Sequence, residues 1–241
     1  MKPATARSAC PPFPALRVRN LVIGHSGKSL SAAINCDFEA GDVVAVVGRN
    51  GAGKSTLLRT LCGLQKPLAG EVLWEGKPLA SMGRKAIARQ VSVTLTVRTM
   101  SPMLTVDDVV ATARIPYTTL SGQLTDDDQK QISAAISLCG LEQMRRRRLS
   151  TLSDGERQRV MIAKAFAQDT PAILLDEPTA FLDYVAVDEI LGLLRQLAHE
   201  RGKLILLTSH QLASVHQYAD SMLELSAMGL QETDALFASM V

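Results

Sequence analysis

The chain of 241 residues has no uninterrupted apolar stretch approaching the ~20 residues that a membrane-spanning helix needs. Its first residues include Lys2 and Arg7, but no apolar segment follows them, which argues against a secretory signal peptide. We therefore expect a protein that is soluble on its own.

Cysteine and net charge are also scarce. The four cysteines are widely spaced and form no C-x-x-C pair, so neither a metal site nor disulfides are expected, and a reducing cytosol fits; they are Cys10, Cys36, Cys62 and Cys139. A net charge of +2 gives no reason to expect nucleic acid as the main partner. The sequence also lacks an internal repeat and a low-complexity block.

What the sequence does contain is a complete phosphate-binding pattern, Gly48-x-x-x-x-Gly53-Lys54-Ser55. An apolar run at 43–47, typical of a strand buried on both faces, leads into it, and helix-forming residues at 56–61 follow. The glycines bring backbone N–H groups close to an anion, and the helix N-terminus adds partial positive charge. Lys54 is suited to the β- and γ-phosphates, and the Ser55 hydroxyl is suited to Mg²⁺.

The remaining chain alternates between strand and helix patterns after a loose tail at 1–15. Further strands are expected at 16–23, 30–38, 71–74, 91–97, 172–175 and 204–207, and helices at 106–114, 125–139, 157–168 and 188–201. This order predicts an α/β fold with a mostly parallel sheet, and 16–241 as one domain. Residues from about 98 to 150 form a helical insertion, in which the basic run Arg145–Arg148 is read as a solvated surface.

Polar residues follow three of the buried strands: Gly48–Ser55, then Asp176-Glu177, then Ser209-His210. Ligands of open α/β sheets gather at the carboxyl ends of strands, so these groups are expected to meet. Asp176 would then hold Mg²⁺, Glu177 would deprotonate the attacking water, and His210 would contact the γ-phosphate. The alternative is that Glu177 is an ordinary surface carboxylate and His210 a satisfied core histidine.

A second motif precedes the helix at 157–168. Ser153 and Glu156 have the S-x-x-E spacing of a capping box, in which each side chain satisfies a backbone N–H of the other residue. Alone, this motif would be interpreted only as a helix cap.

Together, five motifs resemble, in order and spacing, the ATP-binding subunits of ABC transporters. They are Gly48–Thr56, Leu152–Arg159, Ile173–Thr179, Phe181–Asp183 and Ser209–His210. The resemblance covers roughly 16–235. It implies a P-loop NTPase core with an antiparallel β subdomain and a helical subdomain. The short single-domain form and the run Asp154–Gln158 are most similar to ATPases of iron–siderophore, heme and cobalamin importers.

The resemblance implies a head-to-tail homodimer that encloses two ATP molecules with Mg²⁺, at the cytoplasmic face of the inner membrane. Residues 98–150 would contact a polytopic membrane permease. A substrate-binding protein would deliver the transported substrate to that permease. Asp183 resembles the family's dimer-contact aspartate. The residues implied to bind ATP are His25, Gly48, Asn50, Gly51, Ala52, Gly53, Lys54, Ser55 and Thr56; those of the signature, acting on the other chain's nucleotide, are Ser153, Asp154, Gly155 and Glu156.

Three positions depart from the family pattern. Thr96 stands where a glutamine is usual, as a shorter candidate ligand for Mg²⁺ and a candidate catalytic residue. His25 replaces the aromatic residue that stacks on adenine. Asp154 replaces a signature glycine, and because its carboxylate would repel a phosphate, we expect it to point away or to meet a cation such as Arg157 or Arg159.

Other functions remain open at this point. A soluble regulatory ATPase of the same fold would need a coiled-coil insertion or a second cassette, and the sequence shows neither. A small-molecule kinase would leave Ser153–Arg159 and His210 unexplained. Within transport, another cargo, export or amino-acid import stays possible.

Overall fold

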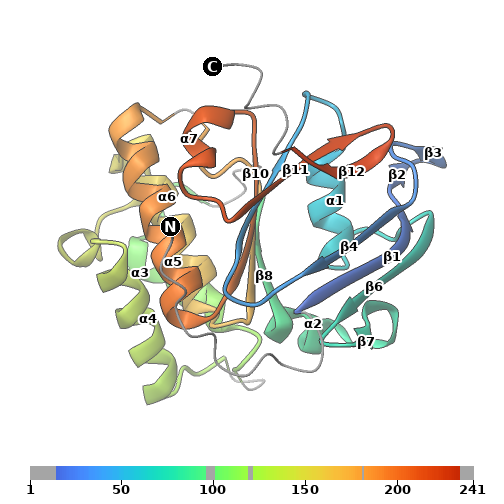
Figure 1. Ribbon diagram of the computed structural model, residues 1–241. Coiled ribbons are helices and arrows are strands. Elements are labelled where there is room, and N and C mark those ends of the chain that lie inside the picture. Colours follow the sequence, from blue (N-terminus) through green and yellow to red (C-terminus); the bar gives the residue numbers. More distant parts are fainter. Residues whose placement is uncertain (1–14, 96–100, 119–121, 181, 234–241) are drawn as a thin grey trace.

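The computed structural model describes residues 15–95, 101–118, 122–180 and 182–233. Two sheets face each other across helix α1, Lys54–Leu61, and the remaining long helices cover the opposite face of the larger sheet (Figure 1). This arrangement confirms the predicted α/β fold with a mostly parallel sheet and a separate antiparallel part.

The larger sheet has six strands in the order β12-β11-β5-β10-β9-β8. All neighbours are parallel except β11 and β12. The strands are β5 Val43–Val47, β8 Val91–Thr94, β9 Ala172–Leu175, β10 Leu204–Ser209, β11 Ser221–Ser226 and β12 Gly229–Glu232. Strand β10 lies between β5 and β9, so the three strands with polar ends are direct neighbours, as the sequence predicts.

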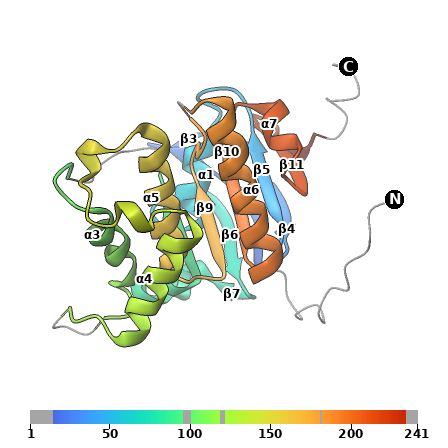
Figure 2. The ribbon, with the colours of Figure 1, turned by 90° about the vertical axis from the view of Figure 1, so that its left-hand side faces the viewer.

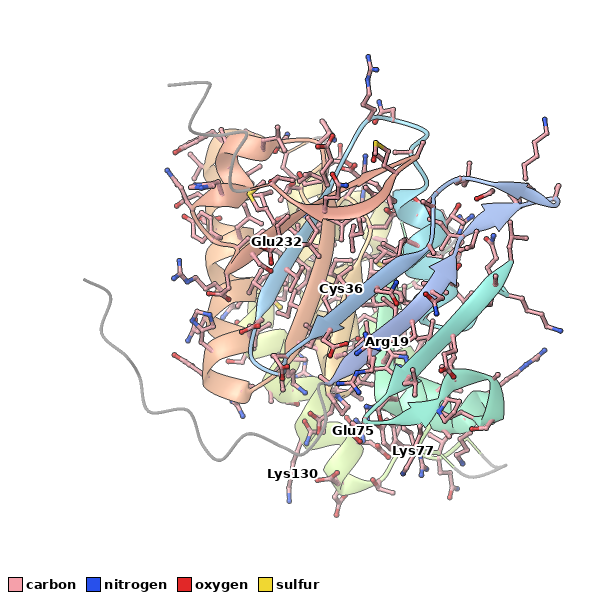
Figure 3. All side chains as sticks on the ribbon, turned by 45° about the vertical axis from the view of Figure 1, so that its right-hand side comes forward. Arg19, Cys36, Glu75, Lys77, Lys130 and Glu232 are labelled. Atoms are coloured by element: carbon pink, nitrogen blue, oxygen red, sulfur yellow. The ribbon has the colours of Figure 1, made fainter. Side chains whose placement is uncertain are left out.

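The smaller sheet is antiparallel, with strand order β4-β1-β6-β7. Its strands are β1 Leu16–Val22, β4 Ile34–Phe38, β6 Ala69–Trp74 and β7 Lys77–Pro78, and a hairpin of β2 Gly24–His25 and β3 Lys28–Ser29 lies beside it. Figure 3 shows Arg19 and Cys36 on β1 and β4, and both Arg17 and Arg19 pair there with Asp37. Such alternation of buried apolar and outward polar side chains is typical of a sheet with one solvated face.

The core forms two clusters, one on each face of the large sheet. In β5, Val44 and Val46 pack with α1 and the antiparallel sheet, whereas Val43, Ala45 and Val47 pack with the helices on the other side. Because successive strand residues point to opposite faces, a strand buried on both sides reads as a continuous apolar run.

The other helices are α2 Arg84–Gln90, α3 Val106–Ala111, α4 Asp126–Leu138, α5 Asp154–Ala167, α6 Tyr184–Arg201 and α7 Leu212–His216, with 3₁₀ turns at Leu79–Ser81, Thr112–Arg114, Glu142–Met144 and Leu149–Thr151. Helices α3 and α4 pack on α5 and extend to one side of the molecule (Figure 2). Complete capping boxes begin α3 at Thr105 and α4 at Thr125. No helix within the described ranges is long and apolar enough to cross a membrane.

Several predicted boundaries were wrong. The strand predicted at 30–38 begins only at Ile34, and β10 continues to Ser209. Helix α6 begins at Tyr184 rather than 188, because the Asp183 side chain accepts the N–H of Ala186 at 2.8 Å and caps the helix there. The elements α2, α7, β11 and β12 were not predicted, and the tail before residue 15 and the region of 96–97 lie outside the described residues.

Candidate nucleotide site

The loop that joins β5 to α1 is shaped by three glycines with positive φ. At Gly48, with φ +148°, a Cβ atom would lie 2.6 Å from the Leu225 carbonyl oxygen, so the close approach of β11 requires glycine. Gly51 and Gly53 have φ +83° and +101°. Helix α1 receives no side-chain cap at Gly53. The first N–H groups of α1 therefore remain suitable donors for an anion at this loop.

The Lys54 side chain folds back over this loop. It is 7% exposed, and its Nζ donates to the Gly48 carbonyl at 2.8 Å. The same Nζ lies 3.5 Å from Oε1 of Glu177. A buried ammonium group is thus held between the phosphate-binding loop and the end of β9.

Glu177 stands at the centre of the site. Its Oε2 lies 2.8 Å from Nδ1 of His210, and its side chain is 16% exposed. The carboxylate therefore joins three elements: α1 through Lys54, the end of β9, and the end of β10 through His210. The interpretation of His210 as a core histidine is wrong, since its side chain is 54% exposed.

Asp176, one residue earlier, is 5% exposed and accepts the hydroxyl of Thr208 at 2.8 Å. Its carboxylate and the Ser55 hydroxyl are the hard oxygen ligands that Mg²⁺ prefers. No cluster of three or more His, Cys, Asp or Glu suited to a metal occurs in the described ranges. Mg²⁺ keeps most of its ligands as water and phosphate oxygen, so the Asp176 carboxylate and the Ser55 hydroxyl are suitable protein ligands for it.

The signature segment forms the N-terminus of α5. Ser153 and Glu156 make the predicted reciprocal capping box. The Ser153 N–H, 2.6 Å from Oε2, holds the pKa of Glu156 below its usual range. Asp154 forms a salt bridge with Arg157, whose Nη1 lies 2.9 Å from Oδ1. The predicted cation for Asp154 is therefore Arg157, whereas Arg159 pairs with Glu189.

Two other predicted residues stand on other elements. His25 is exposed on the short β2 strand, and Asp183 caps α6. Thr96 and Phe181 lie outside the described residues. A hollow of about 440 Å³ lies beside the phosphate-binding loop, lined partly by Arg49, Asn50 and His210.

One residue of the site received no role from the sequence. Thr208 is fully buried, donates to Asp176 and accepts the N–H of Glu177 at 2.9 Å. The sequence does contain a signal, because Thr208 and Ser209 are polar residues at the end of an otherwise apolar strand. Its partners become visible only when β9 and β10 lie side by side.

The glycine loop, the buried lysine, the two carboxylates that follow β9 and the histidine that follows β10 define a nucleotide-hydrolysing P-loop cassette. The sequence profile described as "ABC transporter" matches residues 32–180, more than half of the chain. The chain therefore belongs to the ABC transporter ATP-binding family and is an ATP hydrolase.

Named relatives agree with this assignment. An ABC transporter ATP-binding protein of Methanocaldococcus jannaschii, MJ0873, is 39% identical over 86% of this chain and 71% of that protein. The iron(3+)-hydroxamate import ATP-binding protein FhuC of Bacillus subtilis is 35% identical over 87% and 78%. Among solved structures, an inward-facing transporter assigned to the metal-chelate type matches with TM-score 0.79 and 29% identity, over 91% of this chain and 82% of that chain.

Proposed function

We propose that this chain hydrolyses ATP with Glu177 as general base and drives import of a metal chelate through a separate membrane permease. The observation that carries the catalytic part is the position of the Glu177 carboxylate, between Lys54 Nζ and His210 Nδ1. A carboxylate held at both oxygens has a defined direction toward a water molecule, as general-base catalysis requires.

Each group then has a separate duty. Gly51, Gly53 and the first N–H groups of α1 bind phosphate oxygens, with Asn50, Ala52 and Thr56 in the same segment, and Lys54 neutralises their charge. Ser55 and Asp176 would hold Mg²⁺, which supplies positive charge to the phosphate oxygens; Thr96 is a further candidate ligand. Glu177 takes a proton from the attacking water, and His210 fixes the carboxylate and reaches the γ-phosphate. His25 stacks on the adenine ring.

The signature completes the pocket from a second copy. Helix α5 packs in the core cluster on the opposite face of the sheet from α1. A Ser153 hydroxyl at the start of α5 would therefore serve a nucleotide on another chain, together with Asp154, Gly155 and Glu156. The start of α6, which Asp183 caps, lies close to the signature in space, since a Cβ atom at Gly155 would be 3.9 Å from Ala186. Asp183 contacts the partner in this assembly. ATP binding closes the homodimer, and phosphate release reopens it, because only the closed state has the γ-phosphate contacts.

The cargo and partner proposals rest on the relatives. FhuC is named for iron(3+)-hydroxamate import, and the structural relative is of the metal-chelate type. The polytopic permease would receive the motion through the helical part at 98–150, at the cytoplasmic face of the membrane. A substrate-binding protein acts on this chain indirectly, through that permease. Nucleic acid is not a partner in this proposal.

Uptake of radiolabelled iron in cells tests the whole proposal. A strain lacking this chain should lose uptake of ⁵⁵Fe-hydroxamate, and the parent chain should restore it. The Lys54→Ala and Glu177→Gln variants should fail to restore uptake. Normal uptake of all labelled iron chelates, heme and cobalamin in the deletion strain would contradict the import proposal while leaving the ATPase assignment intact.

A further inference from the structure

The hydroxyl of Thr208 links the two adjacent carboxylate residues of the site. It donates to Oδ1 of Asp176 at 2.8 Å, and its oxygen accepts the backbone N–H of Glu177 at 2.9 Å. We infer that Thr208 is a positioning residue for hydrolysis, which fixes Asp176 and Glu177 relative to each other. This inference rests on the proposed role of Glu177.

The chemistry of a hydroxyl group determines the direction of both bonds. An ionised carboxylate can only accept, so the single hydroxyl proton goes to Asp176. A backbone N–H can only donate, so the lone pairs of the same oxygen face Glu177. Thr208 has an exposed fraction of 0%. Water therefore cannot easily take the place of the Thr208 hydroxyl. Loss of this hydroxyl would remove one hydrogen bond from the Asp176 carboxylate and one from the Glu177 N–H.

The backbone of Glu177 has a particular need for such a restraint. Its φ is +50°, in the left-handed region that non-glycine residues seldom adopt. Two bonds hold the peptide groups on either side: the Glu177 N–H to Thr208, and the Ala180 N–H to the Glu177 carbonyl at 3.1 Å. In this backbone conformation the chain leaves the direction of β9 at Glu177, and the Glu177 carboxylate contacts His210 and Lys54.

The register of the sheet explains why residue 208 has this position. Leu207 of β10 is paired with Leu175, the last residue of β9, so Thr208 lies level with Asp176. Strand β10 also carries His210 two residues later. A shift of β10 against β9 would thus move the Thr208 and His210 contacts together.

The chain offers a matched control, Thr170, at the other end of β9. The Thr170 hydroxyl accepts the Ser92 N–H at 3.1 Å and donates to the Ala172 carbonyl at 2.7 Å, and Thr170 is 1% exposed. Both buried hydroxyls thus accept a backbone N–H and donate to an oxygen atom, which is a backbone carbonyl for Thr170 and a carboxylate for Thr208. Thr170 lies before the first residue of β9, however, whereas Thr208 lies beside the strand's end.

The experiment compares Thr208→Val, Thr208→Ser and Thr170→Val in the full chain. Two quantities are measured: kcat and KM for ATP, and hydrogen exchange of the Glu177 amide in the nucleotide-free protein by NMR. Thr208→Val should lower kcat about 10- to 100-fold with KM within about threefold, because misplacement of a reacting group mainly raises the barrier. It should also speed exchange of the Glu177 amide at least about tenfold.

Thr208→Ser should keep kcat and the exchange rate of the Glu177 amide within about threefold of the parent values. Thr170→Val should leave both quantities near the parent values, although this variant also loses stability. If Thr208→Val does not fold, Thr208→Cys replaces it, since sulfur is a much weaker donor and acceptor. Parental kcat and parental Glu177 exchange in that variant would overturn the inference, as would equal losses of kcat in Thr208→Val and Thr170→Val.

The proposed function fails in a different way. Parental hydrolysis by Glu177→Gln would remove the general-base assignment, whatever Thr208→Val does. Parental hydrolysis by Thr208→Val with an inactive Glu177→Gln would remove only the positioning role.

Discussion

Oε2 of Glu177 lies 2.8 Å from Nδ1 of His210, although 33 residues separate the two in sequence. Strands β9 and β10 bring them together, since these strands are parallel neighbours that end at the same edge of the sheet. The contact joins the proposed base to the proposed γ-phosphate ligand, so the two residues are expected to act as one unit.

Glu177→Gln should lower the rate of ATP hydrolysis by at least about 100-fold, because an amide cannot accept the proton from water. ATP affinity should stay within a few fold, since the amide keeps the size of the side chain and adds no negative charge. A fluorescent ATP analogue and a phosphate-release assay measure the two quantities. Glu200→Gln at the far end of α6 is the control and should behave as the parent. Hydrolysis at half the parental rate by Glu177→Gln would contradict the assignment.

His210→Ala should also reduce hydrolysis, by about 10- to 1000-fold, since it removes the group that orients the carboxylate. Residues that act as a unit show strongly non-additive losses. The double variant His210→Ala with Glu177→Gln should therefore be little slower than Glu177→Gln alone. Additive losses in this double-mutant cycle would show that the two side chains act independently.

Asp154→Gly should strengthen ATP-driven association about two- to fivefold, because it removes a carboxylate from the helix terminus proposed to face the γ-phosphate. The Asp154–Arg157 pair is surface-exposed, at 48% and 37%, so its loss should cost at most about 1 kcal/mol of stability. Asp126→Gly alters the same position of α4 and should leave association unchanged. Weaker association of Asp154→Gly would indicate that the carboxylate supports the signature.

The buried pair Arg114–Asp128 connects the 3₁₀ turn Thr112–Arg114 to α4, with Nε and Oδ1 2.7 Å apart, and Arg114 also donates to the Ala167 carbonyl. Arg114→Ala should lower the free energy of unfolding by about 3–5 kcal/mol, because it leaves a buried carboxylate unpaired. Arg17→Ala breaks an exposed pair with Asp37 and should cost at most about 1 kcal/mol. Urea denaturation measures the free energy of unfolding of both variants. Equal losses of stability would contradict the claim that the buried pair contributes more than the exposed one.

The same pair gives a pH dependence. Burial raises the pKa of Asp128, but the Thr125 N–H and the Arg114 guanidinium outweigh it and hold the pKa below the usual carboxyl value. A carboxyl group whose folded-state pKa is depressed stabilises the fold above its unfolded pKa of about 3.9, and that stability is lost as the pH falls through the folded-state value. Asp128→Asn should therefore flatten the loss of stability below about pH 4. An unchanged slope would contradict this account.

The sequence predicted the elements with strong local patterns. The apolar runs of β5, β9 and β10, together with their polar ends, place Lys54, Glu177 and His210 correctly because the topology of a parallel sheet leaves few alternatives. The capping box at Ser153 is also a local pattern, and the structure contains it.

The parts that the sequence missed depend on contacts between distant segments. Helix α2 has no fully buried residue, so it carries no apolar stripe to detect. The early start of α6 depends on the cap made by Asp183, a residue interpreted only through its family role. The partners of Thr208 and the close approach of Leu225 to Gly48 arise from strand register, which no local pattern contains.

The central claim is that two copies of this chain enclose ATP, each completing the other's site. Sedimentation of Glu177→Gln with and without Mg²⁺ and ATP tests it most directly, with Ser153→Ala in the same background as the comparison. We expect a monomer without nucleotide, a dimer with Mg²⁺ and ATP, and loss or marked weakening of that dimer when Ser153 is replaced. A Glu177→Gln protein that binds ATP yet remains monomeric, even with its permease present, would contradict it.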